Sequence, residues 1–154
     1  MSPTAVSKNK EYIIDAGVVI KWFSKDREKY WEESRKLIRQ VKEKKIVVYA
    51  PEFLVIEVIN ICFNKKHFSV EEITKVIQFL LGSGIEFVKI STDSFIAIVK
   101  IMCGYKTSAY DALYLLLAKE KKCKLLTFDN ELLKKKDLAI SIAEGTSSPK
   151  GTSY

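Results

Sequence analysis

Short apolar runs alternate along the chain with longer segments of helical periodicity. The runs are rich in β-branched residues, which favours strands, and they lie at residues 12–14, 46–49, 85–90, 124–127 and 138–142. The segments between them predict helices at residues 18–23, 27–45, 51–64, 69–81, 91–103, 108–122 and 131–135. Because strands separated by helices need crossover connections, we expect an α/β protein with a mainly parallel sheet of four or five strands, covered on both faces.

Local signals mark several helix starts. Ser69 and Glu72 have the spacing of a capping box. Pro51 is expected in the first turn of a helix, where its missing N–H is tolerated. In the segment 27–45, the spacing of Trp31 and the aliphatic residues after it predicts an apolar stripe facing the core.

The two ends of the chain lack this patterning. Residues 1–9 are polar and residues 144–154 are mostly turn-forming, so we expect flexible tails around one domain that spans residues 10–143. No apolar run approaches the ~20 residues of a membrane span. The N-terminus also lacks the apolar core of a secretory signal, and we therefore expect a cytoplasmic protein without membrane contact.

Composition adds a basic surface and a reducing environment. The chain has 26 Lys and Arg against 19 Asp and Glu, a formal net charge of +7, which favours polyanionic partners. Its three cysteines, Cys62, Cys103 and Cys123, are scattered without paired spacing and are typical of core residues in a cytosolic protein. The only histidine, His67, lies in a polar turn, where a surface position is expected.

Four acidic residues stand in apolar surroundings with no Lys or Arg three or four positions away: Asp15, Glu57, Asp111 and Asp129. Carboxylates in buried segments are rare unless they are paired or bind metal. Each also has an ordinary explanation. Asp15 and Asp129 follow strands and can cap the next helix, Asp111 completes a capping pattern with Ser108, and Glu57 can reach solvent along its stem.

Topology brings the four acids toward one place. Asp15 and Asp129 follow predicted strands, whose carboxyl ends share one edge of a parallel sheet, where ligands bind. Asp111 and Glu57 lie in the first and second turns of helices that start at this edge. Two unit charges 4 Å apart repel by roughly 4 kcal/mol at an effective dielectric constant of 20, so such a cluster takes up protons or binds cations. Oxygen ligands without His or Cys select Mg²⁺ or Mn²⁺ rather than zinc.

Four segments carry a resemblance to a known family. Residues 14–23 (IDAGVVIKWF), 51–60 (PEFLVIEVIN), 108–118 (SAYDALYLLLA) and 126–129 (LTFD) resemble the four acidic motifs of PIN-domain ribonucleases, most closely the VapC-type toxins of toxin–antitoxin pairs. The resemblance covers residues 11 to about 142. It implies a PIN-like three-layer α/β/α sandwich, RNA cleavage that depends on Mg²⁺ or Mn²⁺, a homodimer, and a cognate antitoxin that blocks the acidic site.

The resemblance also implies roles for individual residues. Asp15, Glu57 and Asp111 match the core metal-site acids, and Asp129 matches a fourth acid that is less uniformly a direct ligand. Thr127 and Asn60 match polar positions near the site. One departure is Gly17, where the family commonly has Ser or Thr, and the missing hydroxyl is expected to affect activity more than fold.

The expected reaction is hydrolysis of an RNA phosphodiester by metal-activated water. Three basic groups are candidates for holding the phosphate backbone: Lys42, Lys44 and Lys45; Lys119, Lys121, Lys122 and Lys124; and Lys134, Lys135 and Lys136. For any single lysine among them, a solvated helix end is the preferred explanation. Tyr30, Trp31 and Tyr105 are candidates for base stacking.

Other classes of protein remain as alternatives. A catalytically weak or inactive RNA- or protein-binding module on the same fold predicts RNA binding that a chelator does not change. A phosphoacceptor receiver domain requires adjacent acids after the first strand and an Asp after the third, whereas Asp15 stands alone and Ser91 follows Ile90. A nucleotide-binding site is excluded because no glycine-rich phosphate loop opens a helix.

Overall fold

The computed structural model describes residues 8–24 and 27–147, and a parallel sheet forms its middle layer. Its strands are β1 (Lys10–Ile14), β2 (Ile46–Pro51), β3 (Glu86–Val88), β4 (Lys124–Thr127) and β5 (Ala139–Ser141). They are ordered β3-β2-β1-β4-β5, and every neighbouring pair is parallel. This confirms the parallel sheet that the sequence predicted.

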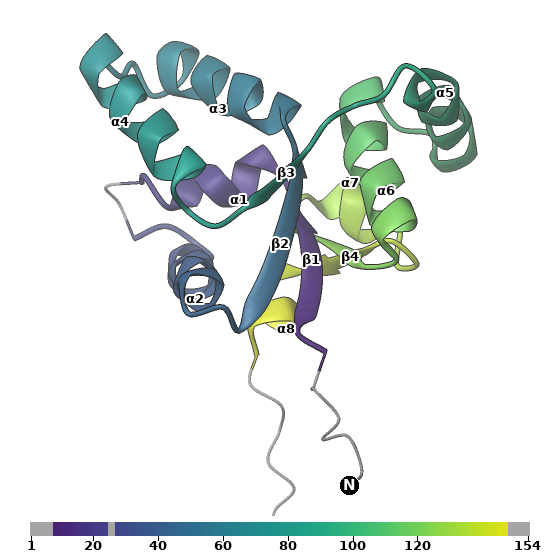
Figure 1. The fold of residues 1–154 in the computed structure, drawn as a ribbon, viewed down its shortest axis with the longest axis horizontal. Coiled ribbons are helices and arrows are strands. Elements are labelled where there is room, and N and C mark those ends of the chain that lie inside the picture. Colours follow the sequence, from purple (N-terminus) through teal and green to yellow (C-terminus); the bar gives the residue numbers. More distant parts are fainter. Residues whose placement is uncertain (1–7, 25–26, 148–154) are drawn as a thin grey trace, which may run out of the picture.

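Helices cover both faces of the sheet and complete an α/β/α sandwich (Figure 1). They are α1 (Ala16–Lys21), α2 (Trp31–Lys42), α3 (Phe53–Asn64), α4 (Val70–Leu81), α5 (Ser94–Tyr105), α6 (Ala109–Lys121), α7 (Asn130–Leu133) and α8 (Ile142–Thr146). Figure 1 shows α1 to α4 on one side of the sheet and α5, α6 and α7 on the other. Helix α6 packs across β1, β2 and β4. Its residues 112–118 are all buried because the helix is apolar on nearly every side.

Local signals explain where several helices begin. The capping box at α4 is confirmed: the Ser69 N–H donates to Glu72 Oε2 at 2.8 Å, and the Glu72 N–H donates to Ser69 Oγ at 3.1 Å. The prediction for Pro51 is wrong, because this residue ends β2 and α3 begins at Phe53. The pairing of β2 with β1 already ends at Tyr49, so no β1 partner lies opposite the missing N–H.

The expected core position of Trp31 is also wrong. The core-facing side of α2 is made by Ser34, Leu37, Ile38 and Val41. Trp31 is half-buried, and its ring lies between the guanidinium groups of Arg27 and Arg35, with 5.3 and 5.0 Å from their central carbons to the ring centroid. The indole of Trp22 fills the core here instead, and its N–H donates to the Ser34 carbonyl at 2.8 Å.

Ordered structure extends further toward the C-terminus than expected. Residues 142–146 form α8, although a tail was predicted from residue 144. The Ser141 hydroxyl caps this helix and Ile142 is fully buried beneath it. A Cβ at Gly145 would lie 2.2 Å from Leu126 Cδ2, so only glycine allows α8 to approach β4 this closely. Residues 1–7 and 148–154 of the predicted tails lie outside the described residues.

Candidate active site

A cleft of about 410 Å³ opens where β1 and β4 end. It is lined by Asp15, Ala16, Gly17, Glu57, Ile61, Asp111, Tyr114, Thr127, Phe128, Asp129 and Leu132. The four acids singled out in the sequence therefore come together from four segments far apart in the chain. They share one cleft, which is named the acidic cleft below.

Asp15 is the most constrained of the four carboxylates. As the residue after β1 it caps α1, and its Oδ1 accepts from the Val18 N–H at 3.0 Å. Its Oδ2 accepts from the Thr127 hydroxyl at 2.6 Å. Burial raises the pKa of Asp15 to about 6, the two hydrogen bonds oppose this rise, and the nearby Asp111 and Asp129 add to it.

Glu57 lies half-buried on α3 and is held by a residue that the sequence analysis missed. Its Oε1 accepts from the hydroxyl of Tyr114 at 2.8 Å, and the Tyr114 side chain is almost fully buried on α6. Burial raises the pKa of Glu57, and Asp15 and Asp111 raise it further. No sequence signal indicates this role, because Tyr114 stands among apolar residues in a helix that is buried on nearly all sides.

Asp111 lies in the first turn of α6. Its N–H donates to the Ser108 hydroxyl at 3.1 Å, so Ser108 caps the helix as its spacing predicted. Burial raises the pKa of Asp111 and Asp129 raises it further, while hydrogen bonds to Ser108 and Thr107 and the charge of Lys135 lower it. Asp111 therefore takes part in the helix cap through its N–H and also lines the acidic cleft.

Asp129 and Thr127 connect the cleft to β4 and α7. Asp129 Oδ1 accepts from the Glu131 and Leu132 N–H groups at 2.8 and 3.1 Å, which caps α7. The Thr127 hydroxyl donates to Asp15 and accepts from the Asp129 N–H at 3.1 Å. Within the described residues, the hydrogen bonds to the Asp129 carboxylate both fall on Oδ1, so capping leaves Oδ2 for other ligands.

Asn60 lies beside the acidic cleft rather than in it. It lines a neighbouring hollow of about 600 Å³ with Phe53, Ile56, Ser108 and Tyr110, and this hollow shares Glu57 and Asp111 with the cleft. The Asn60 side-chain oxygen accepts from Asn64 Nδ2 at 2.6 Å. Asn60 therefore lies outside the acidic cleft, which the other predicted site residues line.

The glycine at position 17 has a structural explanation. A Cβ there would lie 3.3 Å from Phe128 Cζ and 3.4 Å from Asp15 Oδ1, both on the wall of the cleft. A serine or threonine would press on the aromatic ring, so Gly17 and Phe128 fit together as a pair.

The donor set of the cleft fits a hard cation. It consists of carboxylates, while His67 is exposed in the turn after α3 and the three cysteines are free thiols elsewhere. Mutual repulsion contributes to the raised pKa values of Asp15, Glu57 and Asp111, and a bound cation would relieve it. In the described part of the chain, no three acidic, thiol or imidazole groups already stand in a metal-binding arrangement. A cation would therefore have to draw the carboxylates together.

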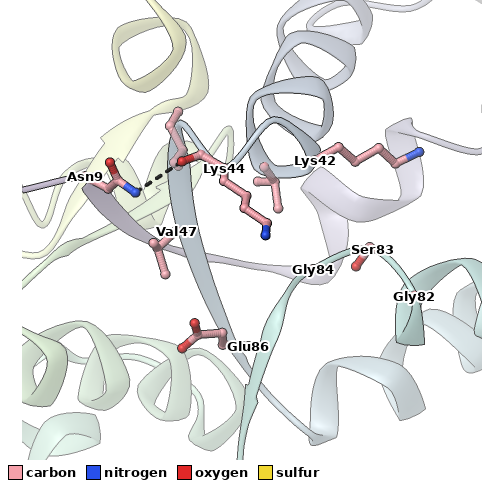
Figure 2. A pocket seen from close by; sticks show the side chains of 10 residues that line it. Asn9, Lys42, Lys44, Val47, Gly82, Ser83, Gly84 and Glu86 are labelled. Atoms are coloured by element: carbon pink, nitrogen blue, oxygen red, sulfur yellow. Dashed lines mark hydrogen bonds between the residues drawn. The ribbon is translucent and has the colours of Figure 1, made fainter.

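A second hollow lies at the opposite end of the sheet, where the strands begin (Figure 2). It has a volume of about 450 Å³, and Glu86 is the one carboxylate among the residues that line it. Figure 2 shows the Lys44 ammonium pointing into it, while the Lys44 carbonyl accepts from the Asn9 amide at 3.1 Å. The predicted basic groups around Lys42 and at the end of α6 lie toward this end and not beside the acidic cleft.

The aromatic side chains proposed for base stacking have other contacts. Tyr30 stacks on Phe128, with 5.7 Å between ring centroids, and the Tyr105 hydroxyl donates to Asp137. Phe128, which the sequence analysis did not single out, is the aromatic residue on the wall of the acidic cleft beside Tyr114.

The fold and the cleft define a class of protein: an α/β/α sandwich with an acidic site at the carboxyl edge of its parallel sheet. The family model described as PIN domain matches residues 12–138. The chain belongs to the PIN domain family, as its four acidic motifs suggested. No curated protein sequence matches it significantly. Within the described residues, no helix has the length and apolar character needed to cross a membrane.

Solved structures with the same fold include three distant relatives. PAE2754 from Pyrobaculum aerophilum is 19% identical with a TM-score of 0.64, covering 90% of this chain and 96% of that one. A toxin–antitoxin complex from Klebsiella pneumoniae is 19% identical with a TM-score of 0.60, covering 85% and 97%. VapBC2 from Rickettsia felis, bound to a DNA fragment from its promoter, is 13% identical with a TM-score of 0.63, covering 85% and 98%.

Proposed function

We propose that this protein is an endoribonuclease that depends on Mg²⁺ or Mn²⁺ and acts as the toxin of a toxin–antitoxin pair. The observation that carries the proposal is the acidic cleft, which four carboxylates from separate segments line without a lysine or arginine among the lining residues. Membership of the PIN domain family and the net charge of +7 support it. The Klebsiella pneumoniae toxin–antitoxin complex, which has the same fold, supports the toxin role.

Asp15, Glu57 and Asp111 would hold the cation, directly or through water, and Asp129 would hold a second ion or orient the attacking water. A bound divalent cation supplies a lowered water pKa and stabilises charge on the phosphate and the leaving oxygen. The chain's own residues prepare the site for it. Thr127 holds one oxygen of Asp15, and Tyr114 holds one oxygen of Glu57, which limits the rotamers of both side chains.

The proposal includes two protein partners. A cognate antitoxin would cover the acidic cleft and block it. A second copy of the chain would form a homodimer, and the exposed apolar side chains of Phe95, Ile96 and Val99 on α5 support such a contact. The three free cysteines are consistent with action in the cytoplasm.

One observation favours a second candidate, a PIN-fold module that binds RNA or protein and cleaves weakly or not at all. The carboxylates are not already arranged as a metal site within the described residues, and glycine replaces the hydroxyl residue at position 17. The two candidates differ in their response to metal.

The decisive experiment is incubation of the purified protein with an RNA pool and Mg²⁺ or Mn²⁺, with and without EDTA. Asp15→Asn removes one charge from the cleft at nearly constant shape, and Asp93→Asn, an exposed acid at the start of α5, is the matched control. We expect cleavage by the wild type and the control that EDTA abolishes, and none by Asp15→Asn.

Cleavage that survives both EDTA and Asp15→Asn would contradict the proposed mechanism. RNA binding without cleavage, unchanged by EDTA, would establish the binding module instead. Melting temperatures of both variants show that a lost activity is not a lost fold.

A further inference from the structure

A third hollow lies directly beside the acidic cleft and has the opposite charge. It measures about 330 Å³ and is lined by Lys21, Lys65 and Lys66 together with Ile20, Ser24 and Glu28. It shares Gly17, Ile61 and Phe128 with the acidic cleft. Four carboxylates and three lysines thus lie on neighbouring stretches of one surface, with the Phe128 ring in the wall that both hollows share. We name it the lysine hollow.

Its three lysines come from two helices that end side by side. Lys21 is the last residue of α1, Lys65 caps the C-terminus of α3, and Lys66 follows it. Helices α1 and α3 pack against each other, so sequence positions more than forty residues apart contribute to one hollow. Basic residues at helix C-termini are favourable, which explains their presence but not their meeting beside the cleft.

The lysine hollow has a surplus of positive charge. Lys21 is mostly buried, forms an ion pair with Glu28 at 2.5 Å, and places its ammonium 5.4 Å from the centroid of Phe128. Glu28 is the one carboxylate among the residues lining the hollow, and Lys66 also acts on it electrostatically. Within residues 8–24 and 27–147, Lys65 and Lys66 form no ion pair and both are exposed. Among the described residues, two ammonium groups of the hollow are therefore without a carboxylate at ion-pair distance.

We propose that the lysine hollow binds a backbone phosphate of the RNA, next to the phosphodiester held at the acidic cleft. This inference rests on the proposed function. The carboxylates of the cleft repel the RNA backbone. The phosphate next to the cleaved linkage is therefore expected to lie outside the cleft, on one side of it. The lysine hollow offers that phosphate positive charge directly beside the cleft, with which it shares Gly17, Ile61 and Phe128. An acidic segment of a protein partner is the competing occupant, and the experiment separates the two.

The binding test uses Lys65→Gln/Lys66→Gln and, as control, Lys75→Gln/Lys100→Gln on exposed faces of α4 and α5. Both double variants lower the net charge by two. Fluorescence anisotropy with a single-stranded RNA oligonucleotide, in EDTA and at several salt concentrations, measures affinity without cleavage. We expect about tenfold weaker binding for the hollow variant, and a plot of log K against log salt that is shallower by about 0.7 for each phosphate that the variant no longer neutralises. The control should match the wild type.

The cleavage test locates the bound phosphate. A neutral methylphosphonate replaces the phosphate one linkage to either side of the cleaved bond, one position at a time. At one of the two positions we expect kcat/KM of the wild type to fall about tenfold, with no further loss when the hollow lysines are also changed. Losses that multiply at both positions, or equal losses in the control variant, would overturn the proposal.

The outcomes distinguish the two proposals. If the wild type cleaves RNA while the hollow variant keeps its affinity and salt dependence, the lysine hollow is wrong and the nuclease stands. If nothing cleaves but the hollow variant alone loses affinity, the nuclease is wrong and the RNA-binding role of the hollow stands. If RNA binding is unaffected and an acidic peptide loses affinity instead, the hollow belongs to a protein partner. The exposed positions of Lys65 and Lys66 allow the variants to fold, which circular dichroism checks.

Discussion

The two ends of the parallel sheet carry charges of opposite sign, and the surroundings of these charges differ. At the amino edge, Lys42 ends α2 with its ammonium 4.6 Å from the centroid of Phe79, and Lys45 pairs with Glu43 at 2.7 Å. At the carboxyl edge, burial and mutual repulsion raise the pKa of three carboxylates in the acidic cleft. At the amino edge the charged side chains are exposed, which costs the fold little free energy. At the carboxyl edge burial of the carboxylates lowers the stability of the fold. That cost in stability supports the proposal that the acidic cleft is the functional end, although the amino-edge hollow is of similar size.

The largest expected effect is the loss of RNA cleavage when a carboxylate is removed at the carboxyl edge, compared with the removal of a lysine charge at the amino edge. Asp111→Asn should lower the rate of metal-dependent RNA cleavage on the order of 10²-fold or more, because it removes a carboxylate from the site of charge stabilisation. Lys44→Gln at the amino edge should change the rate by less than about fivefold, as for an exposed charge. Single-turnover cleavage of one RNA under both substitutions makes the measurement. Equal losses would show that the contrast between the two ends has no functional meaning.

The second effect is a gain in stability when Asp15 loses its charge. Its pKa rises from 3.8 in the unfolded chain to about 6 in the fold, so the folded state keeps the proton longer. Stability of the wild type therefore falls as pH rises from about 4 to 6 and then levels off. Allowing for a weakened hydrogen bond from Thr127, Asp15→Asn should add about 2 kcal/mol at pH 7.5 and little below pH 4.

Urea unfolding at several pH values without divalent metal tests this gain. Asp93→Asn keeps Asp15 and changes only an exposed side chain, so its stability should follow that of the wild type at every pH. Saturating Mg²⁺ should stabilise the wild type and not Asp15→Asn. A variant less stable than the wild type at pH 7.5 would contradict the view that the cleft is maintained at a cost in stability.

A smaller effect is expected from the hydroxyl that holds Glu57. Tyr114→Phe removes the donor at 2.8 Å and leaves the ring in the core. The Mg²⁺ concentration needed for half-maximal cleavage should rise about tenfold, in the range seen when the hydrogen-bond partner of a metal ligand is removed. Tyr110→Phe, on an exposed ring, is the matched control. An unchanged metal requirement would mean that Tyr114 only fills space.

The smallest effect concerns the wall of the cleft. Gly17→Ala should gain about 1 kcal/mol of helix propensity and lose a similar amount against Phe128, leaving stability nearly unchanged. In a Phe128→Leu background the clash is relieved, and the same substitution should then stabilise by about 1 kcal/mol. Thermal unfolding of the four proteins measures the coupling. Additive effects would show that the two residues do not constrain each other.

Most of the fold and the four acids could be predicted because their signals are local. Strand runs, caps and the isolated acids are visible within a few residues, and the rule that carboxyl ends of parallel strands share an edge supplied the rest. Helix α8 was missed because Glu144 and Gly145 are typical of a tail. What makes Gly145 necessary is its close approach to Leu126 on β4.

The contacts around the acids could not be predicted from the sequence. Tyr114 meets Glu57 across 57 positions of the chain, and Lys21 meets Lys65 and Lys66 only because α1 packs against α3. The lysine runs around Lys42 and at the end of α6 reflect helix ends at the amino edge, whereas Lys135 in the third run acts on Asp111. Charge clusters in sequence and in space therefore differ, because Lys21, Lys65 and Lys66 line the neighbouring hollow without belonging to these runs.

The Phe128 side chain lines both the acidic cleft and the lysine hollow. The Lys21 ammonium lies 5.4 Å from the centroid of this ring, and Asp15 lines the acidic cleft on which the same ring lies. With a small side chain in its place, the ammonium would gain a route to the carboxylate and serve as a built-in counter-ion competing with any arriving cation. We therefore expect the size of the side chain at position 128 to affect whether Lys21 or a cation from solution balances the charge of the cleft.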